Sequence, residues 1–469
     1  MINVLWAVAC VAMPTAGGEA KNCSQVLQEA TKKQCELFAP PNDTNAIAPL
    51  AFVPVPGPRA VRACELLVFV HPERADVVAR RMLWPTPLAK AEKRLFASGK
   101  AWWQRWKVTH DLGASINLPI DYRDVVDSLG RSIHTVVVSQ THSDSTPLVL
   151  SHGYASGCGI YFAAAAPLAE QWPGPVYILD SPGCGLSDRP PWSKVNADLC
   201  SVEEAEDFYV ERLEGWRAAM GIDKMVLCGH SLGGYLNVAY AERYAQHVER
   251  LVLVSPAGVP QGKPMTPERK AELPILFRAV IGLWESGWGP FTVVRWGPGK
   301  WLMSGYVQRR FRDGSWRDSE ALTDYFHANV THGEESWGGC AHATLLRPGA
   351  FARSPLCDRL PRLDFATIQQ VSFVYGGDGD WMSASHAREL QAAAPGRHVP
   401  PIEVATVAGA GHNLMVDNPI GFVEALLASG GRDAIVPGGF DGRTFGEEAL
   451  RMDMSGDLEV GAQPSLRGV

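Results

Sequence analysis

Short apolar runs alternate with amphipathic stretches through the middle of the chain. Runs rich in Val, Ile and Leu predict β-strands at 116–122, 133–140, 147–150, 176–179, 250–255, 371–375 and 402–407, and one more strand leads into Gly229. Apolar residues at helical spacing predict helices at 88–106, 161–170, 202–220 and 232–246. The first two strands form an antiparallel pair around a turn at 127–131. This alternation predicts an α/β fold in which helices cover both faces of a mostly parallel sheet.

Two of the predicted helices carry further local signals. Ser201, with Glu204 three residues later, has the spacing of an N-cap for the helix at 202–220. Trp102, Trp103 and Trp106 recur along the helix at 88–106. We expect these tryptophans to pack on the body of the protein rather than to rest on a membrane.

Composition limits the classes of protein to consider. The chain has 469 residues, 46% of them hydrophobic and 20% charged, which is enough to bury a full core in one large domain with extensions. A net charge of -7 argues against nucleic acid as a partner. The ten cysteines include no Cys-x-x-Cys pair and no spacing with histidine that suits zinc. We therefore predict neither a metal site nor a disulfide framework.

The sequence Gly229-His-Ser-Leu-Gly233 joins a predicted strand to a predicted helix, with Ser231 at the turn. A serine at such a turn is held in a strained conformation, and only small neighbours leave room for the strand and helix to pack around it. Among 46 glycines the pattern by itself arises readily by chance. It gains meaning only if an acid and a histidine follow in the right order.

An acid and a histidine both follow Ser231 in the sequence, each after a predicted strand. The strand at 371–375 leads to Asp380, and the strand at 402–407 leads to His412. A serine hydroxyl needs a base to take its proton, and a carboxylate fixes the tautomer of that imidazole. Ser231, Asp380 and His412 are therefore the predicted catalytic residues, in the chain order Ser, Asp, His. Asp380 is preferred to Asp378 because of its reach from the strand end.

Loops after two other strands supply backbone groups to the same edge of the sheet. The glycine-containing loop at 152–154 places the amide of Tyr154 near the predicted nucleophile, and Leu232 follows Ser231 directly. We predict that these two amides form an oxyanion hole. His152, Asp180 and Ser187 are interpreted as residues that hydrogen-bond the loop backbones, without a direct part in chemistry.

Seven segments together resemble one branch of the α/β-hydrolase superfamily, the branch of cardiolipin deacylases, lysophospholipases and lysophosphatidic-acid acyltransferases. The segments are 84–92, 152–154, 229–235, 251–258, 375–376, 380–382 and 411–419. Asp-Trp-Met at 380–382 and the His-x4-Asp pattern are more specific than the serine motif. The resemblance implies a serine hydrolase of acyl-lipid esters that needs no cofactor, with acyl transfer from acyl-CoA to a lysolipid as an alternative. Some members of this branch lack the serine and act as lipase coactivators; Ser231 argues against that role.

His412 and Asp417 form the His-x4-Asp pattern that is associated with acyl transfer in that branch. A simpler interpretation is available. Asp417 precedes Asn418-Pro419, and an aspartate at this point is suited to cap the next helix, with the proline in its first turn. We favour capping. Epoxide hydrolase and haloalkane dehalogenase chemistry need a carboxylate at position 231, so Ser231 argues against both.

The predicted domain plan is an N-terminal extension at 1–83, core segments at 84–256 and 371–429, a helical lid at 257–370 and a disordered tail at 430–469. The lid interleaves aromatic and basic residues, which suits contact with phospholipid head groups and an acyl-chain channel; otherwise the tryptophans form the lid's own core and the arginines a solvated face. The residues are Trp284, Trp288, Trp296, Trp301, Trp316 and Trp337 with Arg295, Lys300, Arg309, Arg310, Arg312 and Arg317.

The start of the chain leaves the compartment open. The apolar stretch at 4–13 has the character of a signal-peptide core without a preceding Lys or Arg, and a short membrane-docking or buried segment is the alternative. Asn22, Asn42 and Asn329 stand in glycosylation sequences. The resemblance favours association with an intracellular membrane (mitochondrion, endoplasmic reticulum or lipid droplet), with the secretory pathway as the second choice.

Overall fold

A computed structural model describes residues 86–109, 119–138, 145–192, 199–261, 298–311, 318–333, 337–364, 366–393 and 401–431, with a few positions between 271 and 295. The predictions for the N-terminal extension and for the C-terminal tail lie outside these residues. So do those for Trp288, Trp296, Trp316, Arg312 and Arg317.

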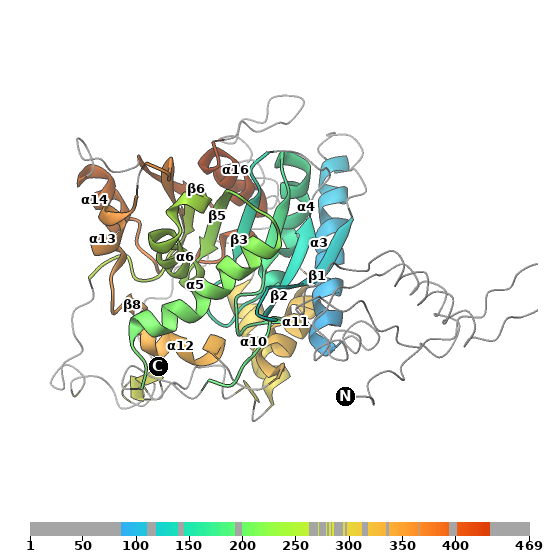
Figure 1. Ribbon diagram of the computed structural model, residues 1–469. Helices are drawn as coiled ribbons and strands as arrows, with labels where there is room; N and C mark the ends of the chain where they lie inside the picture. Colours follow the sequence, from blue (N-terminus) through green and yellow to red (C-terminus); the bar gives the residue numbers. More distant parts are fainter. Residues whose placement is uncertain are drawn as a thin grey trace, which may run out of the picture. The chain divides into compact units, whose positions relative to one another are not determined.

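Eight strands of the described residues form one sheet in the order β1-β2-β4-β3-β5-β6-β9-β10 (Figure 1). β2 pairs antiparallel with β1 and with β4, and all other neighbours are parallel. The strands are β1 (Ile120–Val126), β2 (Ser132–Val138), β3 (Leu148–Ser151), β4 (Val176–Leu179), β5 (Met225–His230), β6 (Val248–Val254), β9 (Gln370–Gly376) and β10 (Ile402–Val407). The predicted mostly parallel sheet is therefore confirmed.

The bounds of β1 were predicted wrongly. It runs to Val126, where it pairs with Ser132, and so continues past the predicted end at 122. The turn explains the difference: an oxygen of Asp127 accepts the amides of Leu129 and Arg131. This tight closure lets the ladder extend to the turn itself.

Helices cover both faces of the sheet. α3 (Pro87–Thr109), α4 (Phe162–Gln171) and α16 (Pro419–Ser429) pack on one face, and α5 (Val202–Ala219) and α6 (Leu232–Arg243) on the other. Ser201 caps α5 as predicted, since its hydroxyl accepts the amide of Glu204 at 3.1 Å. α6 ends at Arg243, three residues before the predicted end, because a 3-10 turn at Ala245–His247 follows.

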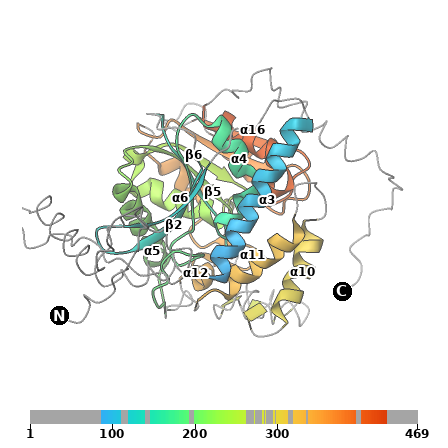
Figure 2. The same ribbon diagram turned by 90° about the vertical axis from the view of Figure 1, so that its right-hand side faces the viewer.

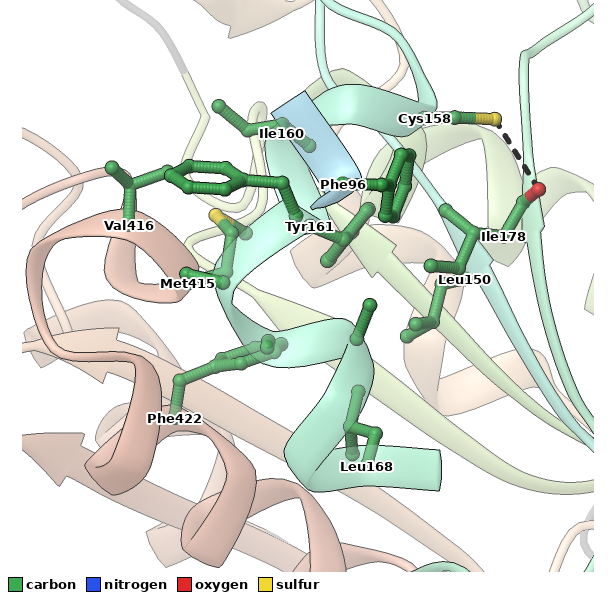
Figure 3. Close-up of a cluster of buried hydrophobic side chains, with 14 of the residues drawn as sticks. Phe96, Leu150, Cys158, Ile160, Tyr161, Leu168, Ile178, Met415, Val416 and Phe422 are labelled. Atoms are coloured by element: carbon green, nitrogen blue, oxygen red, sulfur yellow. Dashed lines mark hydrogen bonds between the residues drawn. The ribbon is translucent and has the colours of Figure 1, made fainter. Parts of the chain in front are cut away.

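The packing around α4 fixes the position of α3. Figure 2 shows α3 running diagonally past α4, and a Cβ atom at Gly99 would lie 2.1 Å from the carbonyl oxygen of Phe162. Only glycine allows the two helices to approach so closely. Figure 3 shows how Phe96, Tyr161 and Phe422 gather around α4 in this apolar layer. Trp102, Trp103 and Trp106 are buried there too, which confirms that they pack on the protein.

The chain between β6 and β9, where the lid is predicted, contains several helices among its described residues. Its described helices include α10 (Gly299–Arg310), α11 (Ser319–Thr331), α12 (Trp337–Leu345) and α13 (Leu356–Arg359), and a hairpin of β7 (Leu346–Arg347) with β8 (Phe351–Ala352) adds a feature that was not predicted. α11 contacts the loop after β3, where the hydroxyl of Tyr325 accepts the amide of Gly159. The insertion therefore lies against loops at the carboxyl edge of the sheet. None of the described helices has the length and apolar character needed to cross a membrane.

Candidate active site

Ser231 occupies a strained turn between β5 and α6. Its φ is 53° and its ψ is -118°, a backbone conformation that a residue with a side chain rarely adopts. The turn is held because the amide of Ser231 donates to the carbonyl of Val254 at 2.9 Å. A Cβ atom at Gly229 would come within 2.6 Å of the Gly233 carbonyl oxygen, so the strand and the helix can pass each other only with glycine at 229. A Cβ atom at Gly233 would lie 2.5 Å from the carbonyl oxygen of His152, so glycine at 233 makes room for the loop after β3. The predicted strand, turn and helix around Ser231 are thus present.

Asp380 and His412 meet beyond the ends of β9 and β10. Nδ1 of His412 lies 3.1 Å from Oδ1 of Asp380, and the Asp380 side chain is almost completely buried. Burial alone would raise the pKa of Asp380, but hydrogen bonds from His412, Ser255 and the Met382 amide outweigh it and lower the pKa. The carboxylate is therefore ionised and oriented toward the imidazole. Asp378, the other candidate, instead accepts the amide of Gly409.

Ser255 is a member of this group that sequence reasoning missed. It follows β6, and its hydroxyl donates to Oδ2 of Asp380. Its φ of 41° is again in the left-handed region, and its amide donates to the Val374 carbonyl at 2.8 Å. A strained serine beside the acid is thus built into the neighbouring strand end. The Ser255-Pro256 dipeptide after an apolar run was the available signal.

His230, at the end of β5, connects that strand to the loop of His412. Its Nε2 donates to the His412 carbonyl at 2.9 Å, and the two imidazole centroids are 4.8 Å apart. Burial, with a smaller effect from His412, lowers the pKa of His230 to about 3, so its ring is neutral. Trp381 covers His412 from outside, with ring centroids 4.7 Å apart. Ser231 and His412 are each only 8% exposed.

The loop after β3 lies against Ser231. A Cβ atom at Gly153 would stand 3.0 Å from Cβ of Ser231, so the residue directly before Tyr154 lies against Ser231. The ring of Tyr154 packs against lid residues, 4.5 Å from His342 and 6.3 Å from Trp284 between centroids. These positions are compatible with the predicted oxyanion hole, which stays a prediction.

His152, Asp180 and Ser187 hold backbone groups, as interpreted from the sequence. Nδ1 of His152 donates to the carbonyl of Gly153 at 2.8 Å, and its Nε2 accepts the amide of Ser181 at 2.9 Å. The hydroxyl of Ser187 donates to the carbonyl of Asp180 at 2.7 Å. Together these bonds fix the two loops that flank the site.

Three buried groups nearby have the composition of a metal site. Glu92, Cys158 and Asp180 each place one oxygen or sulfur atom within 4.8 Å of the others. Asp180, however, accepts the amides of Cys158 and Leu186, each at 2.7 Å, and the thiol donates to the Ile178 carbonyl. Burial, with the two neighbouring carboxylates, raises the pKa of Cys158, so the thiol keeps its proton. A cation would have to displace these bonds, and the cluster is better described as a support for the loop.

The prediction that Asp417 caps the next helix is wrong. The cap of α16 is Asn418, whose side chain accepts the amide of Gly421 at 3.0 Å, and Pro419 occupies the first turn as expected. Asp417 instead accepts the amide of Gly411 at 3.0 Å and pairs with Arg310 of the lid. A proline in the first position makes the residue directly before it the cap, so Asn418 was the better choice.

Two interpretations were considered for the aromatic and basic residues of the lid: contact with phospholipid, or a tryptophan core with a solvated basic face. The residues that the structure describes do not all fit one of them. Trp284 is half-buried, whereas Trp301 on α10 is 73% exposed. Lys300 pairs with Asp324 at 2.7 Å, and Arg295 donates to the Gly333 carbonyl at 3.1 Å. Arg309 is exposed. The side chain of Trp337 lies outside the described part.

Asn329 does not have the accessibility of a glycosylation site. It is buried, and its side-chain amide donates to the carbonyl of Ser156 at 3.0 Å. A glycan on this nitrogen would have to break that bond and open the contact between α11 and the loop after β3. Of the three glycosylation sequences, the other two lie outside the described residues.

The sheet order, the strained serine after β5 and the acid and histidine after β9 and β10 are the features of an α/β hydrolase. Residues 148–425 match the sequence model of the alpha/beta hydrolase family, and the chain belongs to that family.

Three relatives of this chain are named for reactions of lipids. A 1-acylglycerol-3-phosphate O-acyltransferase of Arabidopsis thaliana is 30% identical over 373 residues, 74% of this chain and 83% of the relative. A (lyso)-N-acylphosphatidylethanolamine lipase of Homo sapiens is 31% identical over 297 residues, 61% and 80% of the two chains. The 1-acylglycerol-3-phosphate O-acyltransferase ABHD5 of Homo sapiens is 32% identical over 298 residues, 62% and 79%. The relatives thus bear names of both hydrolases and acyltransferases.

Proposed function

We propose that this chain is a serine hydrolase that cleaves carboxylic esters of acyl lipids, phospholipids or lysophospholipids, through an acyl-enzyme. The observation that carries the proposal is the strained Ser231 at the carboxyl edge of the sheet, with the ionised Asp380 against Nδ1 of His412. The lipid class is supported by the human lipase relative.

The proposed reaction uses each group at a defined atom. Nε2 of His412 takes the proton of Ser231 as Oγ attacks the acyl carbonyl, and Asp380 stabilises the imidazolium that forms. The amides of Tyr154 and Leu232 donate to the oxyanion. His412 then gives the proton to the departing lysolipid alcohol. Water, activated by the same imidazole, releases the fatty acid and restores Ser231.

Acyl transfer is the second candidate, and the plant relative favours it. The acyl-enzyme is the same in both reactions. In the transfer, Ser231 takes the acyl group from acyl-CoA, and His412 protonates the CoA thiolate that leaves. The alcohol of lysophosphatidic acid then gives its proton to His412 and attacks the acyl-enzyme in place of water, which restores Ser231. A third candidate is a non-catalytic partner of a lipase at a lipid droplet. We place the protein at a membrane or lipid-droplet surface, bound peripherally.

A lipid panel separates these candidates. Purified full-length protein is incubated with phospholipids and lysophospholipids, and separately with acyl-CoA and lysophosphatidic acid, and the products are identified by mass spectrometry. Free fatty acid released without acyl-CoA supports the hydrolase. Consumption of acyl-CoA that depends on lysophosphatidic acid, with no fatty acid released in its absence, supports the transferase. No turnover in either assay supports the non-catalytic partner.

A further inference from the structure

The histidine loop is joined to the lid through Asp417. The guanidinium of Arg310, at the end of α10, lies 3.3 Å and 3.2 Å from the two carboxylate oxygens of Asp417. One of those oxygens also accepts the amide of Gly411, the residue directly before His412. The carboxylate therefore bridges a lid helix and the backbone of the catalytic loop.

The loop is held from its other side by His230. Because that ring donates to the His412 carbonyl and Asp417 accepts the Gly411 amide, the two backbone groups around His412 are fixed by different elements. The side chains of Arg310 and Asp417 are 28% and 14% exposed, so their pair is partly shielded from water. Such a two-pronged charge pair sets geometry as well as energy.

α10 is itself anchored, so that the position of Arg310 is defined. Met303 and Val307, on the inner side of the helix, are buried in the apolar layer. Tyr306 packs edge-on against Phe311 and Phe326. A displacement of α10 would move the guanidinium away from Asp417 and remove one constraint on the carboxylate that holds Gly411.

We propose that Arg310 is a positioning residue that couples the placement of lid helix α10 to the catalytic histidine through Asp417. On this account the aspartate of the His-x4-Asp pattern neither caps a helix nor reacts. When α10 is in its observed position, Asp417 holds the main chain of His412 at the right distance from Asp380 and Ser231. The proposal rests on the proposed function for its catalytic consequence, whereas the coupling itself is a property of the fold.

Hydrogen exchange tests the coupling without reference to activity. In the full-length protein, Arg310→Met and Asp417→Asn should each speed amide exchange in the segment around Gly411 and His412. Arg94→Met is the matched control, since it removes another ion pair of the lid, with Asp324 and Glu320 of α11. Unchanged exchange around Gly411 in Arg310→Met would overturn the coupling, whether or not the protein is a hydrolase.

Kinetics with a small soluble ester, p-nitrophenyl butyrate, test the positioning role. Small displacements of a catalytic group cost up to about 100-fold in rate, and we expect a roughly tenfold loss of kcat in Arg310→Met and in Asp417→Asn with KM nearly unchanged. The double variant should be no slower than either single one, and Arg310→Lys should recover part of the loss. Losses that multiply in the double variant, or a change in KM alone, would refute the role. Lack of ester hydrolysis by the unaltered protein would instead refute the proposed function.

Discussion

Ser255 helps to hold the carboxylate of Asp380 in the orientation in which it contacts His412. Its hydroxyl is one of four groups that donate to Asp380, together with His412 and the amides of Gly376 and Met382. Because hydrogen bonds to a charged group are worth about 1.5 to 3 kcal/mol, the loss of one should weaken the orientation of the imidazole without removing it.

We expect Ser255→Ala to lower kcat about tenfold on a soluble ester while KM changes little. Ser429→Ala is the control, since it removes a buried serine that donates to a helix carbonyl on α16. Steady-state kinetics of both variants decide the matter. An activity of Ser255→Ala equal to that of the control would show that the remaining donors suffice.

His230 makes the folded protein sensitive to acid. Its pKa is lowered to about 3 in the fold, from an ordinary value near 6.5, so that the unfolded chain binds a proton that the native state excludes. The stability linked to this ring is thus complete above pH 6.5 and is lost as the pH falls toward 3. The loss amounts to about 1.4 kcal/mol for each pH unit in that window.

His230→Gln should therefore flatten the acid side of the stability profile. Between pH 7 and pH 5 the unaltered protein should lose about 2 kcal/mol more free energy of unfolding than the variant does. Urea denaturation at the two pH values measures this difference. Parallel losses in the two proteins would mean that another buried group, such as His152, dominates the acid response.

α13, near the end of the lid, is bound to helices α5 and α6. Arg359 binds Glu206 of α5 through both terminal nitrogens and also pairs with Glu242 of α6. The hydroxyl of Tyr235, in the first turns of α6, donates to Glu206. The side chains of Arg359 and Glu206 are only 8% and 5% exposed, and Arg359 is the nearer of two cations beside Glu206, since Arg243 lies 3.8 Å away.

Removal of the Arg359 cation alone should lower the free energy of unfolding more than removal of both Arg359 and the Glu206 charge. Arg359→Met leaves the buried carboxylate of Glu206 with only the more distant cation of Arg243, 3.8 Å away, and we expect a loss of about 3 kcal/mol in the free energy of unfolding. The double variant Arg359→Met with Glu206→Gln should be more stable than the single one. Equal or additive losses in chemical denaturation would show that the contact acts through packing alone.

On the surface of the molecule, α10 presents an apolar side chain to solvent. Trp301 is 73% exposed, and tryptophan is suited to the boundary between water and lipid. We expect Trp301→Ala to reduce sedimentation with anionic phospholipid vesicles several-fold without affecting hydrolysis of a soluble ester. Leu129→Ala, which removes a side chain of similar exposure from the turn after β1, should bind as the unaltered protein does. Equal loss in both variants would argue against a docking role for α10.

The sequence was sufficient for the sheet and for the position of Ser231. Apolar runs and the glycines around Ser231 are local signals, and consecutive parallel strands bring their ends together without knowledge of distant contacts. The positions of Asp380 and His412 were predicted from the same rule, that parallel strands end at one edge of the sheet. Asp380 and His412 lie after β9 and β10, and in the structure they meet.

Contacts that join distant segments were not predictable in this way. Arg310 and Asp417 are 107 positions apart in the sequence, and nothing local in the lid indicates which face of α10 meets the core. Ser255 and His230 were overlooked because each stands at a strand end, where its side chain finds a partner only through neighbouring strands. Sequence patterns report periodicity, whereas these contacts depend on how separate elements are placed.

We propose that Ser231 is the nucleophile of a serine hydrolase, and this role can be tested by labelling the purified full-length protein with a fluorophosphonate probe. Mass spectrometry then identifies the peptide that contains the modified residue. We expect a stable adduct on Ser231, greatly slowed labelling in His412→Ala and none in Ser231→Ala. An unlabelled native protein, or an adduct on a different serine, would contradict it.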